Sequence, residues 1–328
     1  MTAPALRLGR IGYLNVLPIY HPLETDIIPH DFEIVSGPPA VLNDMMARGE
    51  LHVSSNSCFE YARHPERYYL VEDLSIGSRG PVMSVLLLSR RPVEELAGET
   101  LLISAETHTS VALLRLLMSR RYKVPVAYET GAVTPRLHSD TPPVAFLAIG
   151  DEALRLRNHP EYPYRVDLAE AWRDWTGLPF IFGLWSVSRA AADAGLFPSD
   201  PAALLRRARD WGLSHMDTIL DLTLHGCPLS REELRIYYRD GLVFHLGEEE
   251  LSGLRLFYAK LADAGMIPAA PPLEFYRFRQ YPAQHPETVH ARSGVSRLLG
   301  SALITTPSAK SRIFSAYKAQ GKHWPKPQ

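Results

Sequence analysis

The amino-acid sequence predicts an α/β protein of two domains, with a ligand cleft between them and two crossings of the chain. The first half alternates short apolar or β-branched runs with segments of helical periodicity, which is typical of α/β folds with largely parallel sheets. Two strand-like segments, residues 81–89 and 178–188, bracket a block with strands and helices of its own. We interpret both segments as crossings, at about residues 85–89 and 183–187.

Strand and helix signals follow one another through the first half of the chain. Each helical segment begins soon after an apolar run ends, as in a βα unit. Strands are expected at residues 6–13, 31–37, 51–55, 100–105, 124–130 and 144–150, and helices at 18 onward, 39–50, 57–68, 109–122 and 151–157.

The strand signals disappear from about Pro201, and helical segments are expected at 200–226, 230–247 and 248–265. Ser230 with Glu233 forms a capping box, and Gly265 stands where a helix C-cap would. Helical spacing of four apolar residues in the last segment predicts one buried face: Leu251, Leu254, Tyr258 and Leu261.

These elements predict a discontinuous first domain of residues 1–89 plus 185–280 and an inserted second domain of residues 90–184. Residues 281–328 contain seven Lys or Arg residues against one acidic residue, with prolines at both ends. Such a composition predicts a solvated, weakly ordered basic extension.

Composition excludes several functional classes. A net charge of −1 leaves no basic footprint for nucleic acid. The apolar stretches at residues 85–88 and 144–150 are far shorter than the ~20 residues of a membrane span. The first residues do not form an export signal, so we expect a cytoplasmic monomer or homodimer whose two cysteines, Cys58 and Cys227, are reduced.

The motifs of several chemistries are missing from the sequence. It contains no GxGxxG after a strand, no GxxxxGK[ST] and no GxSxG. The thirteen histidines include no HExxH and no cluster with zinc spacing. We therefore expect a protein that acts without cofactor, metal or covalent nucleophile.

Three polar clusters stand where strands end and helices begin, at residues 13–15, 54–57 and 106–110. Capping alone explains any one of them. The free N–H groups of a helix N-terminus also bind anions, and two such sites facing each other suit a small dicarboxylate. The candidate binding residues are Tyr13, Ser54, Ser55, Asn56, Thr107, Thr109 and Ser110.

Three further side chains are candidates for the same cleft. Ser84 follows the turn at Gly80 and is expected at the floor of the cleft, unless it is a strand serine bonded to backbone. Asp151 follows a strand and either contacts ligand or caps the next helix. Asn15 lies three residues before Pro18, one or two positions too early to cap a helix that begins there. We expect Asn15 to point into the cleft near Ser84.

An ordered set of segments resembles the MqnA-type chorismate dehydratases of the futalosine route to menaquinone. The likeness runs from residue 6 to about 275 and is carried by YLNVLPIY, GELHVSSNSCFEYARHPERY, SRGPVMSVLLLS, THTSVALLRLLM, IGDEAL and WTGLPFIFGLWS. The resemblance implies a type II periplasmic-binding-protein fold in a cytosolic enzyme. The sequence departs from the residues usual in that family at His52, Asn56 and Cys58.

The resemblance also implies a reaction: chorismate loses water and becomes 3-[(1-carboxyvinyl)oxy]benzoate. Aromatisation drives this reaction, so the protein's task is positioning and the stabilisation of developing charge by hydrogen bonds. We expect Asn15 and Ser84 to be catalytic, as groups that orient the departing hydroxyl. The proton-abstracting base stays open, and the substrate's own side-chain carboxylate is one candidate.

Two alternatives stay open. A 1,4-dihydroxy-6-naphthoate synthase of the same pathway usually opens with a Ser-Pro-Cys-Pro-Asn-type loop, which this sequence lacks. A non-catalytic protein that binds small anions would have the same cleft but normally an export signal.

Overall fold

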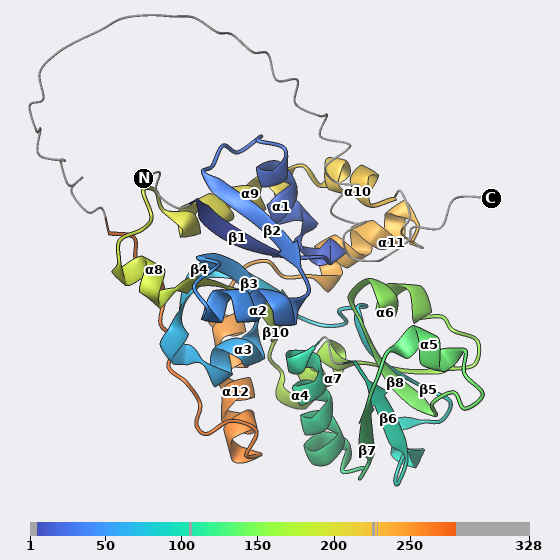
Figure 1. The fold of residues 1–328 in the computed structure, drawn as a ribbon. Helices are drawn as coiled ribbons and strands as arrows, with labels where there is room; N and C mark the ends of the chain where they lie inside the picture. Colours follow the sequence, from blue (N-terminus) through green and yellow to red (C-terminus); the bar gives the residue numbers. More distant parts are fainter. Residues whose placement is uncertain (1–4, 105–106, 225–226, 228, 280–328) are drawn as a thin grey trace, which may run out of the picture. The chain divides into compact units, whose positions relative to one another are not determined.

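A computed structural model describes residues 5–104, 107–224, 227 and 229–279 of the chain. In this part of the chain two five-stranded sheets form two lobes (Figure 1). The basic extension expected at residues 281–328 lies outside the described residues, as does Glu106.

The first lobe is built on a mixed sheet in the order β2-β1-β3-β10-β4. β1 pairs in parallel with β2 and β3, while β10 runs antiparallel to β3 and β4. The strands are β1 (Leu6–Ile11), β2 (Phe32–Gly37), β3 (Val53–Ser57), β4 (Tyr68–Ser78) and β10 (Phe180–Ser188). The early helical elements are η1 (Leu14–Val16), α1 (Leu17–Glu24), α2 (Pro39–Ala47), α3 (Cys58–Arg63) and η2 (Pro65–Arg67).

The second lobe has the sheet order β7-β6-β8-β5-β9. β6 pairs in parallel with β7 and β8, and β5 runs antiparallel to β8 and β9. The strands are β5 (Val85–Ser89), β6 (Thr100–Ile103), β7 (Ala127–Thr130), β8 (Ala145–Ile149) and β9 (Tyr164–Asp167). The helical elements are η3 (Val93–Glu95), α4 (His108–Leu116), the π-helix η4 (Leu117–Tyr122), α5 (Val133–Leu137), α6 (Gly150–Leu156) and α7 (Leu168–Thr176).

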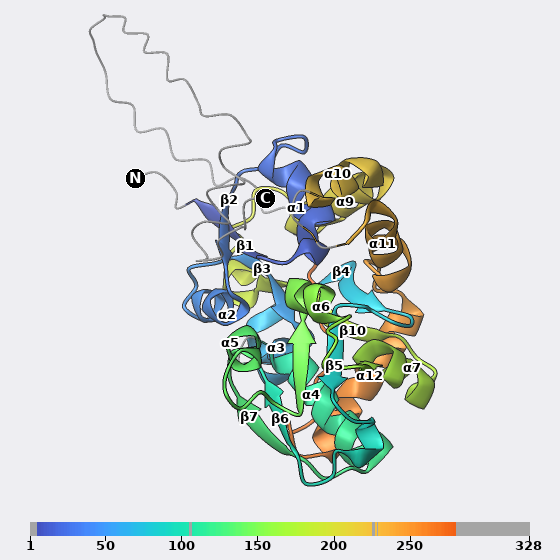
Figure 2. The ribbon, with the colours of Figure 1, turned by 90° about the vertical axis from the view of Figure 1, so that its right-hand side faces the viewer.

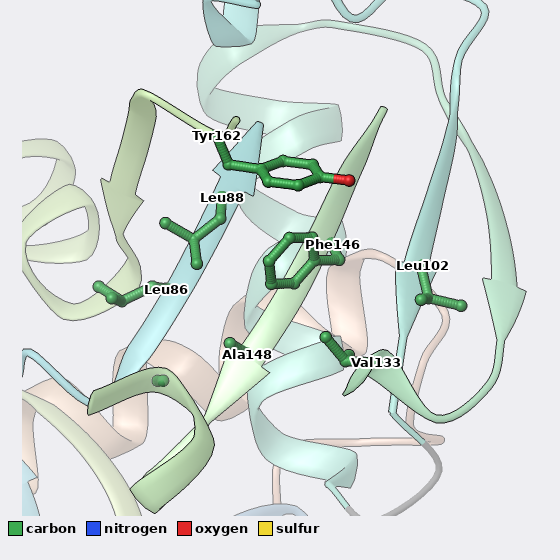
Figure 3. Close-up of a cluster of buried hydrophobic side chains, with 8 residues drawn as sticks. Leu86, Leu88, Leu102, Val133, Phe146, Ala148 and Tyr162 are labelled. Carbon is green, nitrogen blue, oxygen red and sulfur yellow. The ribbon is translucent and has the colours of Figure 1, made fainter. Parts of the chain in front are cut away.

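A compact apolar cluster forms the core of this second lobe (Figure 3). Leu86 and Leu88 of β5 and Phe146 of β8 are each at most 2% exposed. The Phe146 ring meets the Tyr162 ring edge-on with 4.8 Å between centroids, and the Tyr162 hydroxyl donates to the Pro143 carbonyl over 2.7 Å. The apolar runs of the sequence therefore fill a core of the lobe's own.

The chain passes between the two sheets twice, through residues 79–84 and through the segment from α7 to β10. The strand at 85–89 pairs only within the second sheet and the strand at 180–188 only within the first. Both crossings thus fall before the positions expected at 85–89 and 183–187. A continuous apolar run indicates a strand that is buried on both faces, but it does not indicate which of two sheets the strand joins. The sequence therefore could not place the crossings to the residue.

Helices dominate the described chain after β10. They are α8 (Arg189–Asp193), α9 (Pro201–Ser214), α10 (Met216–Leu224), α11 (Arg231–Ile236), the π-helix η5 (Tyr237–Gly241) and α12 (Glu248–Asp263). Strand pairing in this described part is limited to isolated bridges at Val243 and Phe275. No helix in the described ranges combines the length and apolarity that crossing a membrane requires.

The caps expected here are confirmed. Ser230 and Glu233 form a reciprocal capping box at the start of α11. Gly265 follows the last residues of α12 with a left-handed φ of 67°. The predicted apolar face of α12 is buried at each of its four positions, with exposures from 0% to 8%: Leu251, Leu254, Tyr258 and Leu261.

Candidate active site

A cavity of about 940 Å³, including the space at its open mouth, lies between the two lobes. The first lobe contributes the ends of β1 and β3, the first turns of α2 and the middle of β10. The second contributes the first turn of α4 and the end of β8, with the 79–84 crossing between them. Eight of the ten predicted site residues line it: Tyr13, Asn15, Ser55, Asn56, Ser84, Thr107, Thr109 and Ser110.

Asn15 does not act as a helix cap. It lies inside η1, whose N-cap is Tyr13, while the N-cap of α1 is Val16, and neither cap residue makes a side-chain capping bond. The Oδ1 atom of Asn15 is buried and has no hydrogen-bond partner among the described residues. A buried carbonyl oxygen of this kind carries a desolvation cost until a ligand or water bonds to it.

β3 presents two of its predicted residues to the cavity and turns a third away. Asn56 is 4% exposed, and both polar atoms of its carboxamide lack a partner within the described chain. Ser55 lines the cavity as well, whereas the hydroxyl of Ser54 donates to the Ser55 carbonyl at 3.3 Å, outside the lining. β3 therefore supplies Ser55 and Asn56, and not Ser54, to the cavity lining.

The first turn of α4 faces the cavity from the second lobe. Thr107 is the N-cap, and its hydroxyl accepts the N–H of Ser110 at 3.3 Å. The Thr109 hydroxyl accepts the N–H of Phe59, in α3 of the first lobe, at 3.1 Å. Thr107 therefore caps α4, as the capping interpretation expected, and Thr109 joins the lobes.

Ser84 lies one residue before β5 rather than on the strand, and three contacts hold it. Its hydroxyl accepts a hydrogen bond from the Tyr237 hydroxyl at 3.2 Å, and its carbonyl accepts the Gly150 N–H at 2.7 Å. The preceding residue, Met83, has a left-handed φ of 63°, and its N–H donates to a carboxylate oxygen of Asp167 at 2.7 Å. An unusual backbone conformation that is held in this way aims the next side chain.

Asp167 connects the two crossings. The same buried carboxylate that receives the Met83 N–H also caps α7, where it accepts the N–H groups of Ala169 and Glu170 at 3.1 and 3.3 Å. Burial raises the pKa of Asp167, and the backbone N–H groups of Val82, Met83, Glu170 and Ala169 act against that rise. Neither the sequence pattern nor its spacing marked this residue.

Asp151 lies beside the cavity rather than in its lining. Its Oδ1 accepts the N–H of Leu14 at 3.3 Å, so the first turn of α6 is tied to η1, next to Asn15. α6 lies at the end of the second lobe that faces the first lobe (Figure 2). The N-cap of α6 is Ile149, so Asp151 does not occupy the cap position expected as one alternative. We take it to position η1.

The structure adds lining residues that the sequence analysis missed. Asn43 of α2 is 8% exposed, and its Oδ1 has no partner among the described residues. His108 opens α4, and Phe182 and Trp185 form part of an apolar wall. The sequence signal that could have identified Asn43 as a lining residue is its position: a polar side chain on the buried face of a largely apolar helix.

Trp185 is itself held from behind. Its indole N–H donates to the Tyr20 hydroxyl at 3.1 Å, and that hydroxyl donates to the Gly9 carbonyl at 2.6 Å. Burial raises the pKa of Tyr20 to about 12, so this hydroxyl stays protonated. The wall of the cavity is thereby fixed against β1.

The described lining contains no Lys, Arg, Asp or Glu side chain, and its titratable members are Tyr13 and His108. No three His, Cys, Asp or Glu side chains of the described chain are grouped as metal ligands. A bound anion would meet carboxamides, hydroxyls and the N-terminus of α4, which donate hydrogen bonds without a full positive charge.

The fold is that of the periplasmic binding proteins. The periplasmic aliphatic sulphonate binding protein SsuA from Escherichia coli has a TM-score of 0.61 at 14% identity, over 92% of this chain and 99% of its own. A protein from Archaeoglobus fulgidus has a TM-score of 0.61 at 16% identity, over 80% and 98%. At these identities the likeness shows the fold alone, which is the two-domain type II fold expected.

The chain belongs to the menaquinone biosynthesis family, whose model matches residues 6–263. A relative from Thermus thermophilus, named chorismate dehydratase, is 30% identical over 80% of this chain and 96% of its own. One of the same name from Campylobacter jejuni is 28% identical over 54% and 66%. The 1,4-dihydroxy-6-naphtoate synthase of Streptomyces coelicolor is 26% identical over 71% and 83%.

Proposed function

We propose that this protein is a chorismate dehydratase, a lyase that converts chorismate to 3-[(1-carboxyvinyl)oxy]benzoate and water. The family match and the name of the Thermus relative support the substrate and the reaction. The observation that carries the proposal is a cavity between two lobes in which the Oδ1 atom of Asn15 and both polar atoms of the Asn56 carboxamide are buried and have no hydrogen-bond partner in the described chain. Such groups await polar atoms of a ligand.

The roles follow from position. Thr107, Thr109 and Ser110 at the first turn of α4 would bind one carboxylate, and Ser55 and Asn56 would face it from the first lobe. Ser84 and Asn15 would contact the reacting ring near its departing hydroxyl. Hydrogen bonds that strengthen as charge develops lower the barrier without titrating.

Elimination removes the hydrogen at C3 and the hydroxyl at C4 and leaves an aromatic ring. The described cavity lining holds no carboxylate, and we propose that the substrate's side-chain carboxylate takes the proton. The hydroxide that leaves C4 combines with that proton, so the products are the aromatic dicarboxylate and water.

Incubation of the purified protein with chorismate, followed by mass spectrometry, tests this function. The product is expected 18 mass units lighter than chorismate, as loss of one water requires, and its absence would contradict the proposal. A protein with both predicted catalytic side chains removed, Asn15→Ala with Ser84→Ala, is the matched control.

The same experiment separates the alternatives. The Streptomyces relative keeps a 1,4-dihydroxy-6-naphthoate synthase in consideration, and such a protein would leave chorismate unchanged. A non-catalytic binding protein would bind a small dicarboxylate in calorimetry without turnover. The cytoplasmic location and the monomeric or homodimeric state stay predictions.

A further inference from the structure

Tyr237 lies behind the cavity, in contact with Ser84. Its hydroxyl donates to the Ser84 Oγ at 3.2 Å, and its side chain is 1% exposed. Tyr237 is not among the lining residues, whereas Ser84 is. The tyrosine therefore reaches the cavity only through the serine.

A π-helical turn brings this hydroxyl into place. α11 ends at Ile236, and η5 begins at Tyr237, so the helix widens where the tyrosines occur. Tyr237 and Tyr238 are each 1% exposed, and the Tyr238 hydroxyl donates to the Leu14 carbonyl at 2.9 Å, one residue from Asn15. π turns of this kind occur mostly as local insertions and frequently at functional sites. One turn thus supports both residues to which we assign the chemistry.

The direction of the Tyr237 hydrogen bond decides what Ser84 can do. A hydroxyl has one hydrogen to donate and two lone pairs that accept. Because Tyr237 supplies the hydrogen between them, the hydrogen of Ser84 is left for a partner on the cavity side. Burial raises the pKa of Tyr237, against a smaller lowering from the bond to Ser84, so the phenol keeps the proton that it donates to Ser84.

We propose that Tyr237 is a positioning residue that holds Ser84 as a hydrogen-bond donor toward the departing hydroxyl of the substrate. The inference rests on the proposed dehydration. No covalent bond to Tyr237 forms or breaks during the dehydration. The phenol polarises the serine hydroxyl, which bonds more strongly to the leaving oxygen as that oxygen gains negative charge.

The test compares Tyr237→Phe with the wild-type protein in the turnover of chorismate. This change removes one oxygen atom and keeps the ring, whose centroid lies 5.4 Å from that of the Tyr238 ring. We expect kcat to fall about 5-fold, since one neutral hydrogen bond contributes about 1 kcal/mol. KM should stay close to that of the wild type, because the bond strengthens in the transition state only.

Two further variants make the result specific. Tyr162→Phe also removes a buried tyrosine hydroxyl, one that donates to a backbone carbonyl in the core of the second lobe (Figure 3), and should leave kcat unchanged. In a Ser84→Ala background the Tyr237→Phe change should add no further loss, because the tyrosine acts only through the serine.

Each outcome is decisive. An unchanged kcat in folded Tyr237→Phe overturns the positioning role and leaves the proposed function intact. The same holds if Tyr237→Phe lowers kcat by the same factor in the Ser84→Ala background as in the wild-type protein. A fall in kcat that accompanies an equal fall for Tyr162→Phe assigns the loss to general stability and also overturns it. Wild-type protein that does not turn over chorismate overturns the proposed function and this inference together.

Discussion

The Thr109 hydroxyl accepts the backbone N–H of Phe59 at 3.1 Å, and this bond joins the first turn of α4 in the second lobe to the first turn of α3 in the first lobe. The thiol of Cys58 lies 3.6 Å from the same oxygen and donates to the Ile181 carbonyl at 3.0 Å. The two lobes thus meet through a hydroxyl that also lines the cavity, so one side chain belongs both to the contact between the lobes and to the candidate site.

The double variant Thr109→Val with Ser110→Ala is expected to bind chorismate about 30-fold more weakly. It removes two hydroxyls from the first turn of α4, one of them the link to Phe59, and each such bond contributes about 1 kcal/mol. Isothermal calorimetry measures the affinity. Ser119→Ala, an exposed serine at the other end of this helical segment, is the control. Equal affinity of folded double variant and wild type would leave these residues with a structural role only.

Asn15→Ala is expected to lower turnover by ~10²–10³, the effect of losing one well-placed donor, and to leave the melting temperature unchanged. The stability expectation follows from the structure, in which Asn15 makes no capping bond. Steady-state kinetics and thermal melting are measured on the same preparation. The exposed Asn158→Ala serves as the control for loss of a carboxamide. Normal turnover with an early melt would contradict the catalytic role.

His108→Gln tests which group takes the proton. If the substrate's carboxylate is the base, turnover should fall by far less than the ~10²–10⁴-fold that general-base catalysis supplies. Tyr13 and His108 are the two titratable side chains in the described lining, and we choose His108 for this test. A loss in the full general-base range, with a shifted pH–rate profile, would make His108 the base.

Glu233 is expected to make stability depend on pH between about 4.5 and 2. Its carboxylate accepts the Ser230 N–H and hydroxyl and pairs with Arg157 of the second lobe, and these contacts lower its pKa from 4.5 to about 2. A depressed pKa stabilises the fold above the unfolded value and loses that contribution as pH falls toward the folded value. Thermal melts of Glu233→Gln should therefore show a lower melting temperature at pH 7 and a shallower decline in acid.

The neighbouring exposed carboxylate gives the matched control for this change. Glu232→Gln removes a charge that pairs only locally, with Arg235, and should melt with the acid dependence of the wild type. Identical acid profiles for the Glu233→Gln and wild-type proteins would mean that the capping box and the Arg157 pair do not contribute to stability.

Gly212→Ala is expected to destabilise the protein by about 1–3 kcal/mol or more, the range for overpacking a close contact. A Cβ at Gly212 of α9 would lie 2.0 Å from the backbone oxygen of Pro18 in α1, and backbone cannot move aside as a flexible side chain can. Chemical denaturation measures the effect. Gly80→Ala, where an added Cβ meets nothing within 4 Å, should be neutral. Equal losses for both would contradict the packing argument.

Much of the architecture was predictable from local pattern alone. Alternating apolar and helical periods indicated the α/β class, and Ser230, Glu233 and Gly265 marked helix ends because capping depends only on residues within one turn. The crossings were misplaced by a few residues, since a doubly buried strand such as β5 has the same composition in either sheet.

For the cavity, the sequence by itself determined which polar residues end strands, and eight of the ten chosen line one cavity. Only the tertiary structure decided that Ser54 turns away, that Asn43 of α2 faces in, and that Asp167 and Tyr237 hold the crossing and Ser84. These relations join residues distant in sequence, such as Ser84 and Tyr237. No local period encodes such contacts, because packing of separate elements alone brings their side chains together.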